Sequence, residues 1–237
     1  MAGLVSPSMA GLVSPPMAGL VSPPMASLEP MWSLESQHWA NGFWLVAGID
    51  EAGRGALAGP LAVAAVILPP DLKPRAYRDS KKLSSQQRQK LAFEIKCEAL
   101  AWAVEFATAA EIDQYNVLQA THRAAARAIS QLSPSPDALI TDYLKLQTDL
   151  PLFAPARADS SSYSVAAASI LAKTARDEYM TRLHQQNPEY GFAQHKGYGS
   201  SQHLLALEQC GVTEQHRTTF APVALLFGGL FTAPRET

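Results

Sequence analysis

The chain has 237 residues, 47% of them hydrophobic and 17% charged, which is enough apolar material to bury the core of one domain. Its 19 Lys and Arg residues against 21 Asp and Glu residues give a formal net charge of -2, which argues against a protein that coats nucleic acid through general positive charge. No apolar stretch reaches the roughly 18 residues of a membrane span. The two cysteines, Cys97 and Cys210, are expected to be free, buried thiols of a cytoplasmic protein.

The chain opens on a repeat, in which MAGLVSPS is followed by two copies of MAGLVSPP that together fill residues 1–24. A period of eight residues fits no solenoid, and the unit has neither an amphipathic face nor the basic start of a secretory signal. We therefore predict a disordered, low-complexity leader over residues 1–40, a folded domain over 41–224 and a C-terminal tail over 225–237.

Four apolar runs in the folded part predict strands, and they lie at residues 43–50, 61–68, 100–109 and 137–146. The second run is continuous and rich in β-branched residues, as in a strand that is covered on both faces. We expect the first two runs to pair with each other in the centre of a sheet.

Helical patterns separate and follow these strands. Ser84 is placed as the N-cap of a helix that runs to about Glu98, with Gln87 in the capping-box position. Residues 116–132 carry Val, Ala and Leu at helical spacing, and residues 162–186 form an Ala-rich pattern against which another element should pack closely. A Gly-rich loop and a short helix follow. This order predicts one α/β domain with a mixed sheet flanked by helices.

Four acidic residues fall at the ends of these elements and not on solvated helix faces. Asp50 and Glu51 end the first strand, Asp142 ends the fourth, and Asp159 precedes the Ala-rich helix. Neighbouring strands lie about 4.8 Å apart, so carboxylates at their ends would repel one another unless a cation lay among them. Oxygen ligands of this kind suit Mg²⁺ or Mn²⁺, two of which can support hydrolysis of a phosphodiester. For Asp159 a helix-capping role is an alternative.

A glycine-flanked arginine, Gly53-Arg54-Gly55, follows the acid pair at once. Glycines let the backbone approach a ligand and direct N–H groups at it, and an arginine can contact phosphate through two parallel hydrogen bonds. Alone, the pattern is equally that of a tight turn. Beside two carboxylates it favours a ligand-binding turn.

Five blocks of the sequence resemble bacterial ribonuclease HII in order and approximate spacing, from about Leu45 to Val223. They are GIDEAGRGALAGPLAVAAVIL, RDSKKLS, LITDYLKL, ADSSSYSVAAASILAKTARDEYM and YGFAQHKGYGSSQHLLALEQCGVTEQHRTTFAPV. The resemblance implies the ribonuclease H-like fold, with a mixed central β-sheet, flanking helices and a helical C-terminal extension. It also implies a metal-dependent endonuclease of DNA repair that uses Mg²⁺ or Mn²⁺. Such an enzyme hydrolyses the RNA strand of RNA/DNA hybrids and cleaves on the 5′ side of single ribonucleotides in duplex DNA.

The resemblance also implies roles for individual residues. The four acids would be the catalytic metal ligands: Asp50, Glu51, Asp142 and Asp159. Substrate contacts would come from the turn that reads the ribose 2′-OH, a tyrosine that stacks on the next sugar, and three groups near backbone phosphate: Gly53, Arg54, Gly55, Tyr198, Ser80, Lys81 and Lys196. A purely structural loop role is the alternative for Ser80 and Lys81. Asp177 matches a recurrent family position, where a structural role is equally expected.

Other interpretations remain open at this point. A non-catalytic module that binds hybrids would have no need of four repelling carboxylates, and a junction resolvase would have no need of the Gly-Arg-Gly turn and Tyr198. The sibling family ribonuclease HIII usually carries Gly-Lys-Gly and an added N-terminal domain. The histidines of the last third could line the substrate groove or be surface and capping residues: His195, His203 and His216. We expect a monomer, and a sliding-clamp partner cannot be read from the sequence.

Overall fold

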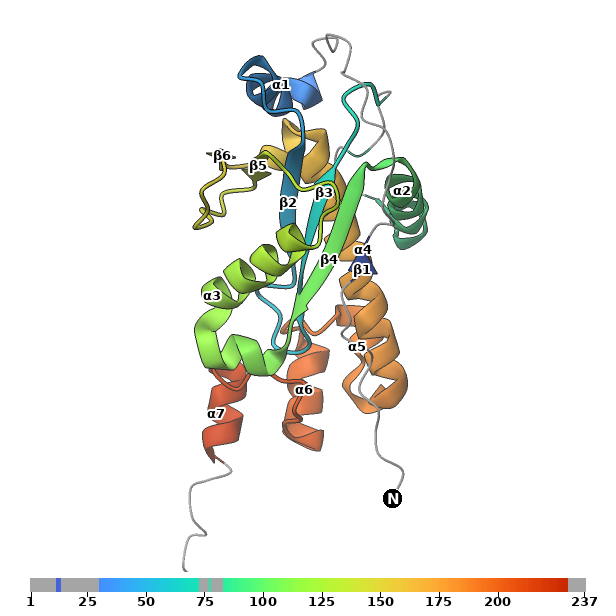
Figure 1. Cartoon of the computed structure of the whole chain (residues 1–237). Helices are drawn as coiled ribbons and strands as arrows, with labels where there is room; N and C mark the ends of the chain where they lie inside the picture. Colours follow the sequence, from blue (N-terminus) through green and yellow to red (C-terminus); the bar gives the residue numbers. More distant parts are fainter. Residues whose placement is uncertain (1–11, 14–29, 73–76, 78–82, 230–237) are drawn as a thin grey trace, which may run out of the picture.

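A six-stranded mixed sheet forms the centre of the computed structural model, which describes residues 12–13, 30–72, 77 and 83–229 (Figure 1). The strand order is β1-β4-β3-β2-β5-β6. Pairing is antiparallel from β1 through β2 and parallel between β2, β5 and β6. The strands are β1 Leu12–Val13, β2 Val46–Ala52, β3 Leu61–Ile67, β4 Ala101–Ala107, β5 Ala138–Thr141 and β6 Leu152–Phe153.

The central strands are buried on both faces, as their continuous apolar sequences predict. Every residue of β3 and of β4 is buried. The expected pairing of the first two strands is confirmed, with Ala47 opposite Ile67 and Asp50 opposite Ala64. Burial decreases along β2 at Asp50, so the acid pair lies where this strand leaves the core.

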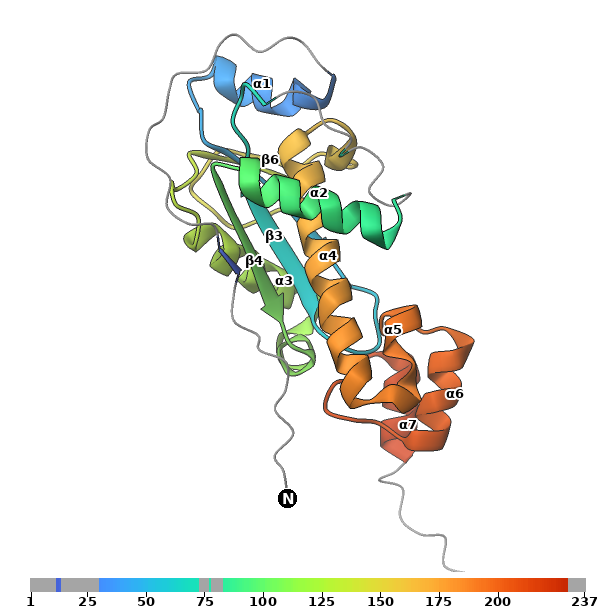
Figure 2. The ribbon, with the colours of Figure 1, turned by 90° about the vertical axis from the view of Figure 1, so that its right-hand side faces the viewer.

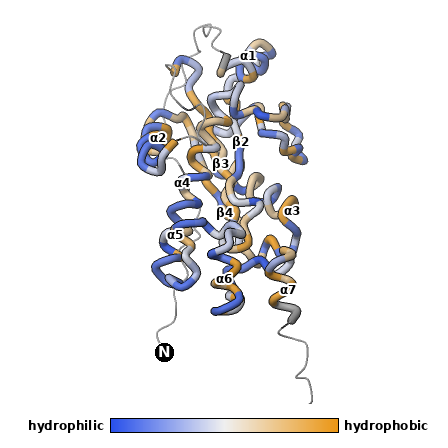
Figure 3. Tube along the Cα trace, turned by 180° about the vertical axis from the view of Figure 1, so that it is seen from behind, coloured by the Kyte–Doolittle hydropathy of each residue, from blue (hydrophilic) through white to orange (hydrophobic). Residues whose placement is uncertain are grey.

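Helices cover both faces of the sheet (Figure 2). α2 (Ser85–Glu98) and α4 (Tyr163–Gln186) share one core with one face of the strands, and α3 (Ala109–Ser130) shares a second core with the other face. The capping box of Ser84 and Gln87 is present as predicted. α3 begins earlier than residue 116, because a second capping box at Thr108 and Glu111 starts it and Asn116 (φ 65°) only interrupts it. In Figure 3, β3 and β4 are coloured mostly as hydrophobic, whereas α2 is largely hydrophilic.

The Ala-rich helix α4 packs unusually close to the sheet. A Cβ atom added at Gly48 of β2 would overlap the backbone of Ser164 and Val165 at the start of α4. This confirms the expected close packing partner and explains why Gly48 has no side chain. The contact lies two residues before Asp50, so the start of α4 is fixed against the strand that carries the acid pair.

The last third of the chain forms a helical extension at the end of the molecule opposite α1 (Figure 1). It contains η4 (Pro188–Tyr190), α5 (Phe192–His195), α6 (Ser201–Cys210) and α7 (Ala221–Gly229). In the described ranges, no helix combines the length and the apolar character needed to cross a bilayer.

Two expectations need correction. Residues 30–40 form η1 (Pro30–Trp32) and α1 (Ser33–Ala40), so structure begins before the predicted leader boundary near residue 40. This segment is ordered because its two tryptophans, Trp32 and Trp39, are 3% and 8% exposed and pack into the core. Cys97 and Cys210 are free but exposed, since both lie near the ends of surface helices.

Candidate active site

Three of the four sequence-selected acids line one open pocket of about 490 Å³. Asp50 and Glu51 lie on β2, and Asp142 directly follows β5. Because β2 and β5 are parallel neighbours, their carboxyl ends meet at the same edge of the sheet. The other residues of this pocket are Ala52, Gly53, Arg54, Gly55, Arg88, Ser169, Lys173 and Tyr198.

The electrostatics of this carboxylate pocket favour a bound cation. Burial, followed by the charge of Glu51 and, more weakly, that of Asp142, raises the pKa of Asp50 to about 7. Burial also raises the pKa of Glu51, although Arg54 opposes the shift with an ion pair of 3.1 Å. Charged carboxylates are therefore disfavoured here without a positive partner. A divalent cation would supply that charge, so the donor set fits Mg²⁺ or Mn²⁺.

The carboxylates are engaged with protein groups in this structure. Glu51 Oε1 accepts a hydrogen bond from Arg54 Nη1, and Asp50 Oδ1 accepts one from the Glu51 N–H at 2.8 Å. Among the described residues, no three His, Cys, Asp or Glu side chains are arranged closely enough to form a complete metal site in advance. Metal binding would therefore compete with Arg54 for Glu51.

Asp159 does not line the carboxylate pocket, but its loop touches Asp142. It lies in η3 (Ala158–Ser160), and the Ala158 N–H donates to Asp142 Oδ1 at 3.2 Å. The N-cap of α4 is Ser162, whose Oγ accepts from the Val165 N–H at 3.0 Å. The alternative of Asp159 as the cap of that helix is therefore wrong.

Left-handed backbone flanks these acids. Tyr143, next to Asp142, has φ 58°, and Arg157, two residues before Asp159, has φ 60°. Non-glycine residues rarely adopt this backbone conformation, and the examples in proteins cluster at active sites and ligand-binding sites. Arg157 is thus in a strained backbone conformation two residues before Asp159.

The glycines of the Gly53-Arg54-Gly55 turn have different surroundings. Gly53 has φ +94°, and a Cβ atom there would overlap the guanidinium of Arg176. A Cβ atom at Gly55 would meet nothing within 4 Å. Gly53 is therefore required by packing behind the turn, and Gly55 leaves the backbone accessible from the pocket side.

Two buried arginines that no sequence pattern indicated hold this turn. Arg176 Nε donates to the Pro60 carbonyl at 2.9 Å, and Nη2 donates to the Lys196 carbonyl at 2.9 Å. Arg217 Nη1 donates to the Arg54 carbonyl at 2.8 Å, and its Nε and Nη2 donate to the Gly59 carbonyl. Both side chains are fully buried. Nothing in the sequence distinguishes them from surface arginines.

Tyr198 lines the carboxylate pocket, and the segment around it is fixed to the turn. Its ring is 40% exposed and lies 5.3 Å from the Arg176 guanidinium. The Leu57 N–H donates to the Gly197 carbonyl at 2.8 Å. Arg176 therefore joins the two segments for which the resemblance implies contact with the sugar.

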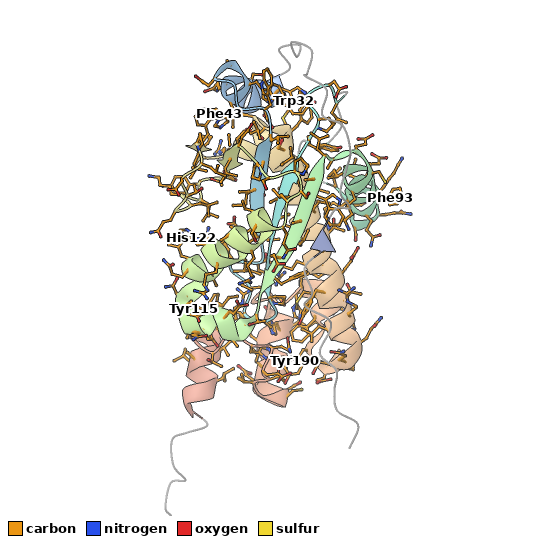
Figure 4. The ribbon with its side chains drawn as sticks, in the orientation of Figure 1. Trp32, Phe43, Phe93, Tyr115, His122 and Tyr190 are labelled. Atoms are coloured by element: carbon orange, nitrogen blue, oxygen red, sulfur yellow. The ribbon has the colours of Figure 1, made fainter. Side chains whose placement is uncertain are left out.

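The histidines of the last third lie behind Tyr198. His203 and His216 are buried, and their Nε2 atoms are 3.2 Å apart. The ring of His216 lies 5.1 Å from that of Tyr190, which Figure 4 shows in the helical extension. His203 Nδ1 donates to the Tyr198 carbonyl at 3.0 Å. His195, His203 and His216 do not line the carboxylate pocket. The expectation of surface residues is wrong for His203 and His216, which support the tyrosine from inside.

Basic side chains from two helices also line the pocket. Arg88 of α2 and Lys173 of α4 both pair with Asp177, at 3.2 and 2.6 Å. Asp177 therefore has a structural role, in which it holds the side chains of Arg88 and Lys173 together. Lys196 lies in a neighbouring pocket of about 250 Å³ shared with Arg88, and its Nζ donates to Thr181 Oγ1. Ser80 and Lys81 lie outside the described residues.

Comparisons with known proteins identify the family to which the chain is similar. A family model described as Ribonuclease HII matches residues 47–223. A ribonuclease HII of Thermus thermophilus is 54% identical over 191 residues, covering 81% of this chain and 93% of the relative. Ribonuclease HII of Halalkalibacterium halodurans is 47% identical over 195 residues, covering 82% and 74%.

Solved structures extend the similarity to the fold. The ribonuclease H2 of Pyrococcus horikoshii matches with a TM-score of 0.69 and 25% identity, covering 79% of this chain and 99% of that one. A ribonuclease HII of Archaeoglobus fulgidus, solved in complex with PCNA, matches with a TM-score of 0.64 and 25% identity, covering 81% and 98%. The length of the family match and the identity to bacterial relatives lead to one conclusion: the chain belongs to the ribonuclease HII family.

Proposed function

We propose that this chain cleaves RNA in RNA/DNA hybrids and single ribonucleotides embedded in duplex DNA, using two divalent cations held by Asp50, Glu51, Asp142 and Asp159. The class of activity, a metal-dependent endonuclease, follows from its family. Mg²⁺ or Mn²⁺ is the proposed cation. Cleavage on the 5′ side of the ribonucleotide, leaving 5′-phosphate and 3′-OH ends, is part of the proposal.

One observation carries the assignment of the site. Asp50, Glu51 and Asp142 line the same pocket as the Gly53-Arg54-Gly55 turn, and the pKa of Asp50 is raised to about 7. When bound, the cations would supply an activated water and stabilise the leaving oxygen. The protein groups would orient the strand. Asp159 would join the ligands from the loop that contacts Asp142 through the Ala158 N–H.

Selection of ribose is assigned to the Gly53-Arg54-Gly55 turn and Tyr198, which line the same pocket as the acids. The accessible backbone at Gly55 and the half-exposed ring of Tyr198 lie in one pocket with the carboxylates. A site whose polar groups pair with a 2′-OH leaves them unpaired against deoxyribose, and an unpaired buried polar group is costly. Recognition of the sugar would therefore decide which phosphate reaches the acids.

A single set of substrates tests the proposal. The protein is incubated with Mg²⁺ or Mn²⁺ and a DNA duplex containing one ribonucleotide, an RNA/DNA hybrid, an all-DNA duplex or a four-way junction. We expect cleavage of the first two only. Binding of the first duplex without cleavage would instead support a hybrid-binding module, and cleavage of the junction would support a resolvase.

A further inference from the structure

A buried carboxylate joins α1 to the start of α4. Glu35 is 1% exposed, and its Oε1 accepts hydrogen bonds from Ser162 Oγ at 2.7 Å and from the Ser164 N–H at 2.9 Å. Ser162 Oγ at the same time accepts from the Val165 N–H. Glu35 and Ser162 therefore satisfy two of the N–H groups that the first turn of a helix leaves without an intrahelical partner.

Further contacts fix the loop before α4 to the same helix. The Leu34 N–H and Ser33 Oγ both donate to the Ser161 carbonyl, at 3.4 and 3.1 Å. The Trp32 ring, at the α1 end of the molecule, lies 4.8 Å from the ring of Tyr163 (Figure 4). Consecutive residues from Ser161 to Ser164 are thus held by consecutive residues of η1 and α1.

Asp159 lies between this anchor and a second one. On its other side, the Ala158 N–H donates to Asp142 Oδ1. The start of α4 is pressed on β2 at Gly48, two residues before Asp50. Asp159 therefore lies in a short segment that is fixed at both ends. One end contacts Asp142, and the other is held by α1 where α4 packs on β2. A shift of α1 would thus move Asp159.

The anchor has an energetic cost that simple packing would avoid. Burial raises the pKa of Glu35 to about 7, and its Oε2 has no hydrogen-bond partner among the described residues. An apolar side chain of similar size would fill the space without this cost. A carboxylate at the N-terminus of α4 is stabilised by the helix dipole, and it fixes the direction of that helix as well as its position.

We propose that Glu35 is a positioning residue of the metal site, which holds Ser161–Ser164 so that Asp159 reaches a cation shared with Asp50 and Asp142. The inference rests on the proposed function, in which Asp159 is a metal ligand. α1 precedes residues 47–223 that the family model matches, so this contribution comes from outside the matched region.

Mn²⁺ binding, measured by the loss of the EPR signal of free Mn²⁺, tests the inference without relying on cleavage. We expect Glu35→Ala to weaken Mn²⁺ binding about tenfold, as when a residue that orients a metal ligand is removed. The Mn²⁺ concentration for half-maximal cleavage should rise by the same factor, with KM for the ribonucleotide duplex unchanged within about twofold. Glu35→Gln keeps an acceptor oxygen and should recover most of the loss.

Two control variants separate positioning from stability. Gln37→Ala changes an exposed residue of α1 and should bind Mn²⁺ like the wild type. Trp39→Ala removes a buried side chain of α1 whose Nε1 has no hydrogen-bond partner in the described part of the chain. It should lower Tm while leaving Mn²⁺ binding by the folded protein unchanged. Unchanged Mn²⁺ binding in Glu35→Ala, or an equal loss in Trp39→Ala, would overturn the inference.

Asp159→Asn distinguishes this inference from the function on which it rests. If Asp159→Asn weakens Mn²⁺ binding and Glu35→Ala does not, only the role of Glu35 is refuted. If Asp159→Asn binds Mn²⁺ like the wild type, the metal assignment of the proposed function fails and the role of Glu35 fails with it.

Discussion

The glycines at positions 53 and 55 show how neighbouring residues of one type can serve different purposes. Gly53 combines a positive φ with direct contact to the Arg176 guanidinium, so the constraint comes from the inside of the protein. Gly55 has open space where a side chain would extend, so its constraint would come from a ligand. The sequence predicted one reason, ligand approach, for both.

Alanine at each position should therefore have a different effect. Gly53→Ala should lower the free energy of unfolding by about 2 kcal/mol or more, because φ is unfavourable and Arg176 must move. Gly55→Ala should leave Tm unchanged and raise KM for the ribonucleotide duplex. Thermal unfolding and cleavage kinetics on both variants provide the measurement. Equal losses of stability would contradict this division.

The raised pKa of Asp50 predicts how stability depends on pH. A folded-state pKa of about 7, against an ordinary value of 3.8, destabilises the metal-free protein above pH 7 and has no effect below pH 4, where the group is protonated in both states. Without metal at pH 8, the free energy of unfolding of Asp50→Asn should thus be about 2 kcal/mol higher than that of the wild type, after allowance for the partial exposure of Asp50. Urea unfolding at pH 8 and pH 4 measures this difference.

The same variant tests the metal assignment. Mn²⁺ should raise the Tm of the wild type but not that of Asp50→Asn, because a ligand stabilises only the state that binds it. Cleavage of the ribonucleotide duplex should be lost in Asp50→Asn. A variant that still cleaves at the wild-type rate would remove Asp50 from the proposed ligands.

At the scale of elements, α4 supplies one side of the site from a single helix. Ser169 and Lys173 line the carboxylate pocket, and Arg176 and Asp177 follow one turn later. These positions lie three or four residues apart, so they share a face of the helix. Asp177 connects that face to α2 through its ion pairs with Arg88 and Lys173.

Asp177→Asn should change cleavage without removing any proposed metal ligand. Arg88 and Lys173 lose their common partner, so we expect kcat to fall severalfold because these groups are no longer aligned. KM should not rise, because the pocket wall gains one net positive charge. The free energy of unfolding should fall by about 2 kcal/mol, since a largely buried acceptor of two ion pairs is neutralised. A higher KM with unchanged kcat would show that Asp177 serves binding alone.

Sequence patterns predicted the elements whose signals are local. Continuous apolar runs indicated β3 and β4, and the Ser84 capping box indicated the start of α2. η1 and α1 were missed because the low-complexity prediction was extended from the repeat of residues 1–24 to residue 40. The core contacts of Trp32 and Trp39 include partners that are distant in sequence. The four acids stood out by position, whereas Arg176 and Arg217 did not, because only the folded chain buries them.

At the scale of the whole molecule, contacts distant in sequence attach the helical extension to the sheet domain. Asp113 of α3 accepts four hydrogen bonds, from the N–H and the hydroxyl groups of Thr218 and Thr219. The buried pair His203 and His216 fills the interior of the extension. Burial, followed by the charge of His203, lowers the pKa of His216 to about 4.

Acidification should therefore destabilise the molecule through His216. A lowered folded-state pKa means that the unfolded chain binds the proton more readily, so the contribution is present above pH 6.5 and is lost as pH falls toward 4. We expect His216→Gln to be less stable than the wild type at pH 7.5, with a gap that narrows by about 2 kcal/mol by about pH 4.5. Urea unfolding across this range provides the test, and a constant gap would refute it.

The hydrogen bond from Arg217 to the Arg54 carbonyl spans 163 positions of the chain. During synthesis, a nascent chain that has not yet released Arg217 from the ribosome already contains every proposed metal ligand, but the turn beside them lacks this brace. Selectivity for ribose would thus depend on a residue that is synthesised after all four acids.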